Sequence, residues 1–211
     1  MSRYVAILPI ALVAAALPVF SQSNVELRVR FAIADAQTEA AFAGVTPAAE
    51  TAGAKLLLLS ADTPGLQTFA ETKVTAVAGT GAKFLAGGEF PMPVQNESGG
   101  LKIEFREYGI RLNFLPAVKP DGEMNLNVAA QISSLDFAHP FTIQGLPVPG
   151  MATRTIASAL DLRPGQSFAI TGLFTPELVD SLARLPGAAS IPVLKELAGL
   201  HPPNVVILVA M

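Results

Sequence analysis

The amino-acid sequence predicts a mainly β protein with a few short helices, in which antiparallel hairpins form a barrel or a sandwich. Several segments alternate apolar and polar residues with a period of two, which is typical of strands with one buried face. Turn residues separate these segments. The composition supports a packed core, because 51% of the 211 residues are hydrophobic and only 15% are charged. Such a composition excludes a disordered chain.

Composition also excludes several classes of site. The chain has no cysteine, so it holds neither a disulfide framework nor a thiolate metal site. Its formal net charge of −3 argues against nucleic acid as a partner, since nucleic acids bind basic surfaces.

Residues 1–23 have the layout of a secretory signal peptide. Arg3 provides a positive charge, residues 4–20 are apolar, and residues 21–23 place small side chains at a cleavage site. The alternative is a membrane anchor that stays in place, because the apolar run is about 17 residues, the lower limit for a membrane span. Removal of the signal peptide leaves one exported domain, residues 24–211.

The first part of this domain contains two predicted strands and one helix. Residues 25–33 alternate strictly, and residues 69–78 alternate loosely. The alanine-rich segment 34–43, followed by Gly44, predicts a short helix with a glycine cap. Two segments have no single assignment: a loop or ragged helix at 46–53, and a run of leucines at 55–60.

A long antiparallel hairpin is predicted in the middle of the chain. Residues 101–115 alternate, but the phase slips at residues 106–107, which predicts a β-bulge there. Pro120-Asp121-Gly122 is a turn, and residues 124–132 alternate again.

Two segments rich in glycine and proline, residues 79–94 and 139–150, precede and follow this hairpin. Proline lacks a backbone N–H, so Pro91 and Pro93 cannot occupy the interior of a sheet. The first segment must therefore be an edge, a kink or a loop. The pair of segments indicates elements that bend away from a sheet, and the alternative is two ordinary loops.

The next part of the chain returns to alternation. Residues 153–162 predict a strand, residues 163–166 a tight turn, and residues 167–174 the return strand. The chain then has about six strands of membrane-crossing length, whereas a single-chain outer-membrane barrel needs at least about eight. Copies of the chain must therefore combine if they are to close a barrel.

Short helices and an apolar strand end the chain. Thr175 and Pro176 have the residue types of a helix N-cap and first turn, and the helix should end near Leu185. Residues 191–200 predict a second short helix, and residues 205–211 predict a final strand.

The sequence offers no catalytic constellation. The two histidines, His139 and His201, each precede a proline, and there is no GxSxG motif. No set of metal ligands clusters at a usable spacing. Gly79-Thr80-Gly81 lacks the third glycine of a dinucleotide-binding loop. The protein is therefore not expected to be an enzyme or to bind a cofactor.

The segment FLAGGEFPMPV at residues 84–94 resembles the FLAGGEFPIPV segment of pilus-assembly secretins. The chain thus resembles the secretin family of type II and III secretion and of Flp/Tad-type pilus assembly. Similar matches follow in the same order and span almost the whole mature chain. They include IEFREYGI at 103–110, LNFLP at 112–116, ISSLD at 132–136 and LRPGQSFAITGL at 162–173.

The resemblance implies a secretin-type core whose antiparallel hairpins contribute to a multi-subunit β-barrel in the outer membrane. It also implies a gate across the lumen for a secreted protein or a pilus. The gate or rim residues would be Gly87, Gly88, Phe90, Pro91, Pro93, Gly145, Pro147, Pro149 and Gly150. The core-motif turn would be Arg163, Pro164, Gly165 and Gln166.

The chain also departs from the family pattern. Secretins usually carry periplasmic ring domains before the core, whereas the core strand here follows the signal peptide directly. Expected partners are further copies, or full-length secretin subunits, and the outer membrane. The alternative is a periplasmic accessory or degenerate secretin-like domain that forms no channel.

Overall fold

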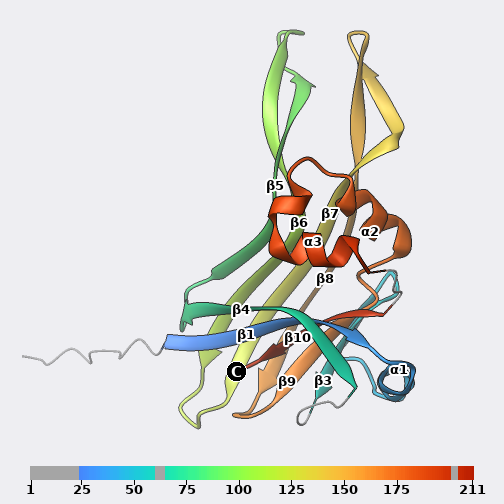
Figure 1. The fold of residues 1–211 in the computed structure, drawn as a ribbon. Helices are drawn as coiled ribbons and strands as arrows, with labels where there is room; N and C mark the ends of the chain where they lie inside the picture. The colour runs from blue at the N-terminus through green and yellow to red at the C-terminus, as the bar shows by residue number, and fades with distance from the viewer. Residues whose placement is uncertain (1–23, 60–64, 201–203) are drawn as a thin grey trace, which may run out of the picture.

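The computed structural model describes residues 24–59, 65–200 and 204–211. The predicted signal peptide at residues 1–23 and His201 lie outside the described residues. The described chain is mainly β, as expected, and its strands form two antiparallel sheets. Figure 1 shows the shorter strands crossing in front of the longer ones.

The first sheet has six strands in the order β2-β3-β9-β10-β1-β4. Its central strands come from opposite ends of the chain, since β1 pairs with β10. The strands are β1 (Asn24–Ala34), β2 (Ala49–Thr51), β3 (Ala54–Leu59), β4 (Leu66–Val77), β9 (Ser167–Thr171) and β10 (Val205–Ala210).

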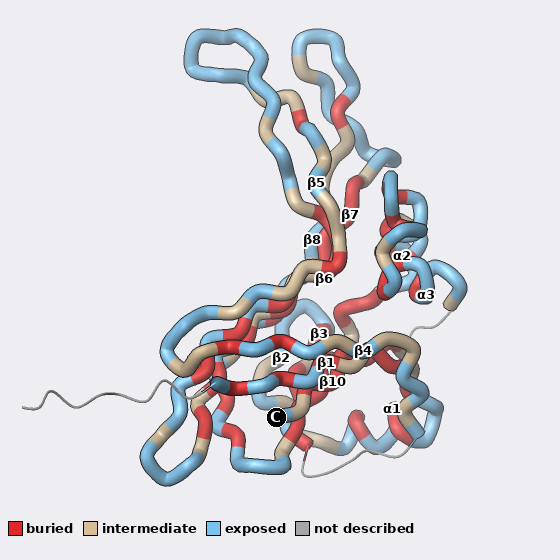
Figure 2. The backbone as a smooth tube through the Cα atoms, turned by 60° about the vertical axis from the view of Figure 1, so that its left-hand side comes forward, coloured by how far each residue is buried: buried red, intermediate tan, exposed pale blue. Residues whose placement is uncertain are grey.

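The second sheet has four longer strands in sequential order. They are β5 (Ala82–Gln95), β6 (Leu101–Val118), β7 (Met124–Ile143) and β8 (Leu146–Leu162). The expected central hairpin is confirmed, because β6 and β7 pair antiparallel on either side of the turn at 119–123. Figure 2 shows exposed backbone at the upper ends of these strands and buried backbone where they meet the first sheet.

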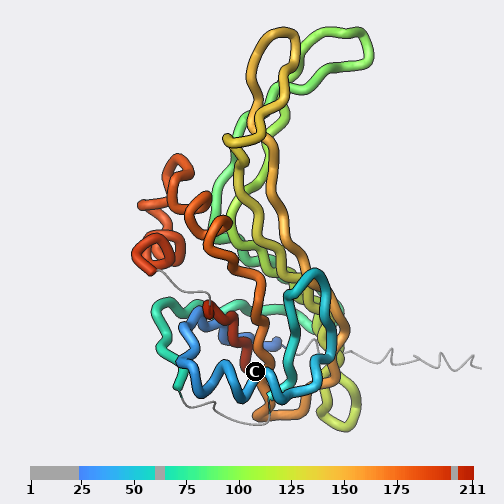
Figure 3. The backbone as a smooth tube through the Cα atoms, turned by 90° about the vertical axis from the view of Figure 1, so that its right-hand side faces the viewer, coloured from blue at the N-terminus to red at the C-terminus, as the bar shows by residue number. Residues whose placement is uncertain are grey.

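The helices are short, and one of them begins at the N-cap that the sequence predicts. They are α1 (Ala36–Ala43), α2 (Pro176–Ala183), a 3₁₀ turn (Ala188–Ser190) and α3 (Pro192–Ala198). The hydroxyl of Thr175 accepts a hydrogen bond from the backbone N–H of Leu178 at 3.4 Å, with Pro176 in the first turn. In Figure 3, α2 and α3 stand to one side of the long sheet.

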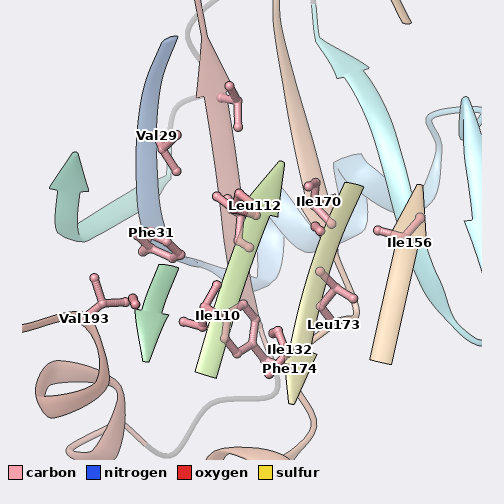
Figure 4. Close-up of a cluster of buried hydrophobic side chains, with 14 of the residues drawn as sticks. Val29, Phe31, Ile110, Leu112, Ile132, Ile156, Ile170, Leu173, Phe174 and Val193 are labelled. Carbon is pink, nitrogen blue, oxygen red and sulfur yellow. The ribbon is translucent and has the colours of Figure 1, made fainter. Parts of the chain in front are cut away.

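The core lies between the two sheets. Phe31 and Phe168 of the first sheet and Leu112 and Ile132 of the second are all fully buried. Figure 4 shows side chains of both sheets directed toward one another, with Leu173 and Phe174 next to Ile132. Burial of such side chains stabilises the fold by about 1.5–3 kcal/mol each.

The return strand does not pair as expected. β9 pairs with β3 and β10 instead of β8, so the chain crosses from one sheet to the other at the 163–166 turn. The cause is burial on both faces: residues 167–170 of β9 are all buried, which suits the middle of a covered sheet. Residues 46–53, expected as a loop or helix, contain β2, which pairs with β3.

The β-bulge expected at residues 106–107 is not found, since β5 and β6 pair in one unbroken register along the whole of β5. The change of phase has another cause. Ile103 and Phe105 are 57% and 65% exposed on one face of β6, whereas Ile110 on the other face is fully buried. The apolar face of β6 therefore changes along the strand: it is the odd-numbered face around Phe105 and the even-numbered face around Ile110. Gly109, with φ +110°, lies near this change.

The segments rich in glycine and proline are not loops. The first forms most of β5, and the second forms the end of β7 and the start of β8. The edge alternative for Pro91 and Pro93 is confirmed, because β5 is the outermost strand of its sheet. The expectation that these segments bend away from the sheet is considered below.

We expect the cap of α1 to make stability depend on pH. The backbone N–H of Thr38 donates to Asp35 Oδ1 at 2.7 Å, and this bond lowers the pKa of the Asp35 carboxyl. Because this pKa is lower in the folded state than in the unfolded state, the charged carboxylate stabilises the folded state at pH values above the unfolded-state pKa. The stabilisation is lost as the pH falls through the folded-state pKa. Asp35→Ala should therefore lower the melting temperature at neutral pH and much less in acid. A pH-independent difference in thermal unfolding would contradict this.

Candidate gate and wall elements

The upper parts of the long strands form two separate hairpins. β6 and β7 pair only from Gly109 and Ser133 toward the 119–123 turn. Beyond that level β6 pairs only with β5, and β7 only with β8, within the described residues. We call residues 88–108 the first arm and residues 137–149 the second arm. Both rise above the sheet in Figure 1, as the bending expectation required.

Three glycines permit the close backbone approach at the root of the first arm. Gly87 pairs directly with Gly109. A Cβ atom on Gly87 would lie closer than 3.0 Å to the carbonyl of Tyr108, and one on Gly109 would lie as close to the carbonyl of Ala86. A Cβ atom on Gly88 would meet the Tyr108 ring. The collisions at Gly87 and Gly109 are with backbone and require glycine, whereas the contact at Gly88 is with a side chain. Gly87 and Gly88 were both singled out from the sequence.

Tyr108 connects the first arm to the helices. Its side chain is buried, and its hydroxyl donates a hydrogen bond to the carbonyl oxygen of Pro186, 2.5 Å away. Pro186 follows α2, so one residue at the root of the arm contacts a segment 78 positions further along the chain.

We expect Tyr108→Phe to loosen this root. The change removes the hydroxyl and leaves the carbonyl of Pro186 without its donor, which costs about 1–3 kcal/mol. Urea unfolding of the purified full chain in detergent should show the loss, and protease should cut the first arm faster. Unchanged stability and unchanged proteolysis would contradict the role assigned to this bond.

The root of the second arm contains a break in the register of β7 and β8, between Asp136 and Phe141. Asp136 Oδ1 accepts hydrogen bonds from the backbone N–H groups of Ala138 and His139, at 2.9 and 3.2 Å. The other carboxylate oxygen lies 2.8 Å from Nδ1 of His139. Gly150, a residue predicted for the gate, pairs with Asp136 just below the break. Local hydrogen bonds to one carboxylate therefore stabilise the irregular stretch.

The tips of the two arms contact each other. Nε2 of Gln144 donates a hydrogen bond to the carbonyl oxygen of Gly99 at 2.7 Å. Gln144 and Gly145 form the two-residue turn of the second arm, with φ of +49° and +83°. Gly145 is thus needed for the turn, and the arms of one subunit are linked at their tips.

The arms carry most of the exposed large apolar side chains among the described residues. Phe105 and Ile103 pair directly with Pro91 and Pro93, so these four residues share one face of the first arm. The other face, which includes Phe90, carries ion pairs from Glu104 to its neighbours at 2.8 and 2.5 Å. The exposed apolar side chains of both arms are Leu101, Ile103, Phe105, Phe137, Phe141 and Leu146. An exposed apolar set of this kind indicates a contact surface.

The predicted core-motif turn lies at the opposite end of the sheet from the arms. The backbone N–H of Gln166 donates to the carbonyl of Arg163 at 3.0 Å, and Gln166 Oε1 accepts from the N–H of Arg163 at 2.9 Å. Gly165 has φ +83° between these residues and follows Pro164. Nε of Arg163 lies 2.9 Å from Oε1 of Glu123 in the neighbouring turn. This turn joins the two sheets and does not meet the proposed gate.

Sequence reasoning did not single out Tyr108, Gly109 or Gln144. A glycine inside an alternating strand was the available signal for Gly109, since glycine in a strand marks a bend or a close approach. The contacts of Tyr108 and Gln144 join residues that are far apart in the chain, so no local sequence pattern predicts these contacts.

Within the described ranges, no group of three or more His, Asp or Glu side chains is placed to hold a metal ion. Among the same residues, no helix has the length and apolar character needed to cross a membrane.

Comparison with known proteins identifies relatives over most of the chain. The family model Secretin, described as bacterial type II and III secretion system protein, matches residues 60–201. Uncharacterized protein y4xJ of Sinorhizobium fredii (strain NBRC 101917 / NGR234) is 38% identical over 125 residues, which cover 59% of this chain and 30% of that protein.

Solved structures of similar proteins are more distant. The type IV competence pilus secretin PilQ of V. cholerae has 14% identity and a TM-score of 0.42, over 87% of this chain and 53% of that one. The type II secretion system secretin GspD of E. coli K12 has 17% identity and a TM-score of 0.39, over 88% and 44%. The chain thus spans less than two thirds of the length of each of these proteins.

Proposed function

The chain belongs to the secretin family of bacterial type II and III secretion system proteins, and from this premise we propose that it is a subunit of a homo-oligomeric outer-membrane channel. The channel would pass a secreted protein or a pilus. The role is transport and not catalysis.

One observation carries the proposal: both outer strands of the four-stranded sheet have a free edge. Among the described residues β5 pairs only with β6, and β8 pairs only with β7. Long unpaired edges favour pairing with another chain.

The strand directions fit addition of a second copy. Each neighbouring pair from β5 to β8 is antiparallel, so β5 and β8 run in opposite directions. A second copy can therefore place its β8 beside β5 and continue the antiparallel order. Each new backbone hydrogen bond contributes about 0.5–1.5 kcal/mol, and head-to-tail repetition of one contact closes a ring.

The two arms are the proposed gate. They extend beyond the shared sheet, have roots built from glycine and irregular backbone, and expose apolar side chains such as Phe105 and Phe137. In a ring, arms of neighbouring subunits would cover these side chains across the lumen. Outward movement of the arms would then admit the cargo.

Export follows from the proposed signal peptide at residues 1–23, which places the chain in the outer membrane or, failing assembly, in the periplasm. The proposed domain is residues 24–211. The partners would be further copies or longer secretin subunits.

Fractionation of cells that make the full chain tests the proposal. We expect a very large species in the outer-membrane fraction that survives unheated gel electrophoresis, and rings in electron micrographs of it. A soluble periplasmic monomer would overturn the channel and favour an accessory domain.

A further inference from the structure

The direction of each backbone N–H along β5 follows from one hydrogen bond at the tip of the first arm. The N–H of Asn96 donates to the carbonyl of Gly100 at 2.8 Å. N–H groups alternate between the two sides of a strand, and the register of β5 with β6 is unbroken. Even-numbered residues of β5 therefore direct their N–H groups to β6, and odd-numbered residues direct theirs to the free edge.

The same reasoning crosses the sheet to β8. The N–H of Lys119 donates to the carbonyl of Glu123 at 2.7 Å, so odd-numbered residues of β7 face β6. Even-numbered residues of β7 then face β8, where their partners are also even-numbered, as in the pair Asp136 and Gly150. Odd-numbered residues of β8 below the break thus direct their N–H groups to the free edge. Above the break the two-residue turn at Gln144 and Gly145 fixes the direction, because the residues that flank such a turn, Ile143 and Leu146, bond to each other. The N–H of Leu146 therefore faces β7, and the odd-numbered residues of β8 in the arm again face the free edge.

All four prolines on these edge strands occupy odd-numbered positions in the arms. They are Pro91 and Pro93 on β5 and Pro147 and Pro149 on β8. Each removes one donor that a neighbouring strand would need, while the pairing inside each arm is kept. The outer edges of the arms, on β5 and β8, therefore cannot support a regular ladder with another chain.

Below the arms the same two edges keep their donors. Residues 82–87 of β5 and 151–162 of β8 contain no proline. Their free N–H groups belong to residues such as Leu85 and Thr155, and Thr155 is exposed. The two proline-free edges lie on opposite sides of one antiparallel sheet. The β5 edge of one copy can therefore pair with the β8 edge of a second copy.

We infer that neighbouring copies pair residues 82–87 of one subunit with residues 151–162 of the next, and that the four prolines end this ladder at the roots of the arms. This inference rests on the proposed oligomeric function. The arms of each subunit stay free of backbone pairing with their neighbours. The bond from Gln144 to Gly99 links them, so they move together as one flap per subunit.

A proline placed lower on the edge tests the inference. Leu85→Pro removes one outward donor and leaves the hydrogen bonds to β6 in place, whereas Leu85→Ala keeps that donor. We expect Leu85→Pro to abolish the large species on unheated gels, and Leu85→Ala to retain it. Protease resistance of the residual monomer checks that Leu85→Pro still folds.

Cysteine cross-linking tests the position of the contact without proline, and the natural chain has no cysteine to interfere. Lys83→Cys is combined in turn with cysteine at 153, 155, 157 and 159. The register places Lys83 and Ala157 in one row, three strands apart, at about 14 Å, beyond the reach of a disulfide within one chain. The matched control pair joins Gln95→Cys with Leu146→Cys, both exposed in the arms.

We expect oxidation to give a series of covalent multimers for at least one wall pair and none for the arm pair. Rings that cross-link through the arms, or rings that form normally with Leu85→Pro, would overturn the inference and leave the channel proposal standing. Absence of rings from the natural chain would overturn both.

Discussion

Replacing Gly109 with alanine is expected to destabilise the folded chain by at least about 3 kcal/mol, through backbone strain and a collision. Gly109 has φ +110°, a conformation that side chains with a Cβ rarely adopt. The new Cβ atom would also lie closer than 3.0 Å to the carbonyl oxygen of Ala86. That oxygen belongs to the paired backbone of β5 and cannot move without breaking the ladder.

Two further variants separate the collision from the strain. Gly122 has φ +84° but nothing within 4 Å of a new Cβ atom, so Gly122→Ala should cost only about 1–2 kcal/mol. Gly87 has no unusual φ but would collide with Tyr108, so Gly87→Ala should approach the effect of Gly109→Ala. Urea unfolding of the purified full chain in detergent measures all three. Equal losses for the changes at Gly109 and Gly122 would refute the collision.

Local chemistry made most elements predictable. Strict alternation in residues 25–33 predicts a strand with one buried face. The structure has β1 at these residues, with Leu27 and Val29 buried. Thr175 and Pro176 report the start of a helix because capping involves only residues within one turn. Such signals depend on short-range geometry and survive in any tertiary context.

The pairing of strands was harder to predict, because alternation indicates which face of a strand is buried and not which strand lies beside it. Residues 167–174 alternate weakly and follow a tight turn, which favoured a hairpin with the preceding strand. β9 pairs with strands from both ends of the chain instead. The phase change at residues 106–107 is visible in the sequence, but the sequence does not distinguish a bulge from an arm that exposes the opposite face.

The candidate gate was predictable in its backbone and not in its side-chain contacts. Glycine and proline restrict the backbone wherever they occur, so Gly87, Gly145 and the edge prolines could be identified from the sequence alone. The bonds from Tyr108 to Pro186 and from Gln144 to Gly99 join distant segments. They depend on how the arms meet in space, which no local pattern encodes.

Removal of both arms should leave a ring that conducts without a gate. The design replaces residues 89–107 with Asn-Gly between Gly88 and Tyr108, and residues 137–149 with Asn-Gly between Asp136 and Gly150. Each new turn then joins residues that already pair directly, and Asn-Gly suits a two-residue hairpin. The wall strands below the arms keep every partner that they have in the intact chain.

Purified rings of this variant, inserted in planar bilayers, should conduct continuously and severalfold more than intact rings, since the constriction is gone. Asp121→Ser, in the turn at the opposite end of the sheet, is the matched control and should conduct like the natural chain. If armless rings form and conduct no more than intact ones, the arms do not close the lumen. If removal of the arms prevents ring formation, the arms contribute to assembly, and the ladder proposed for residues 82–87 and 151–162 is not sufficient by itself.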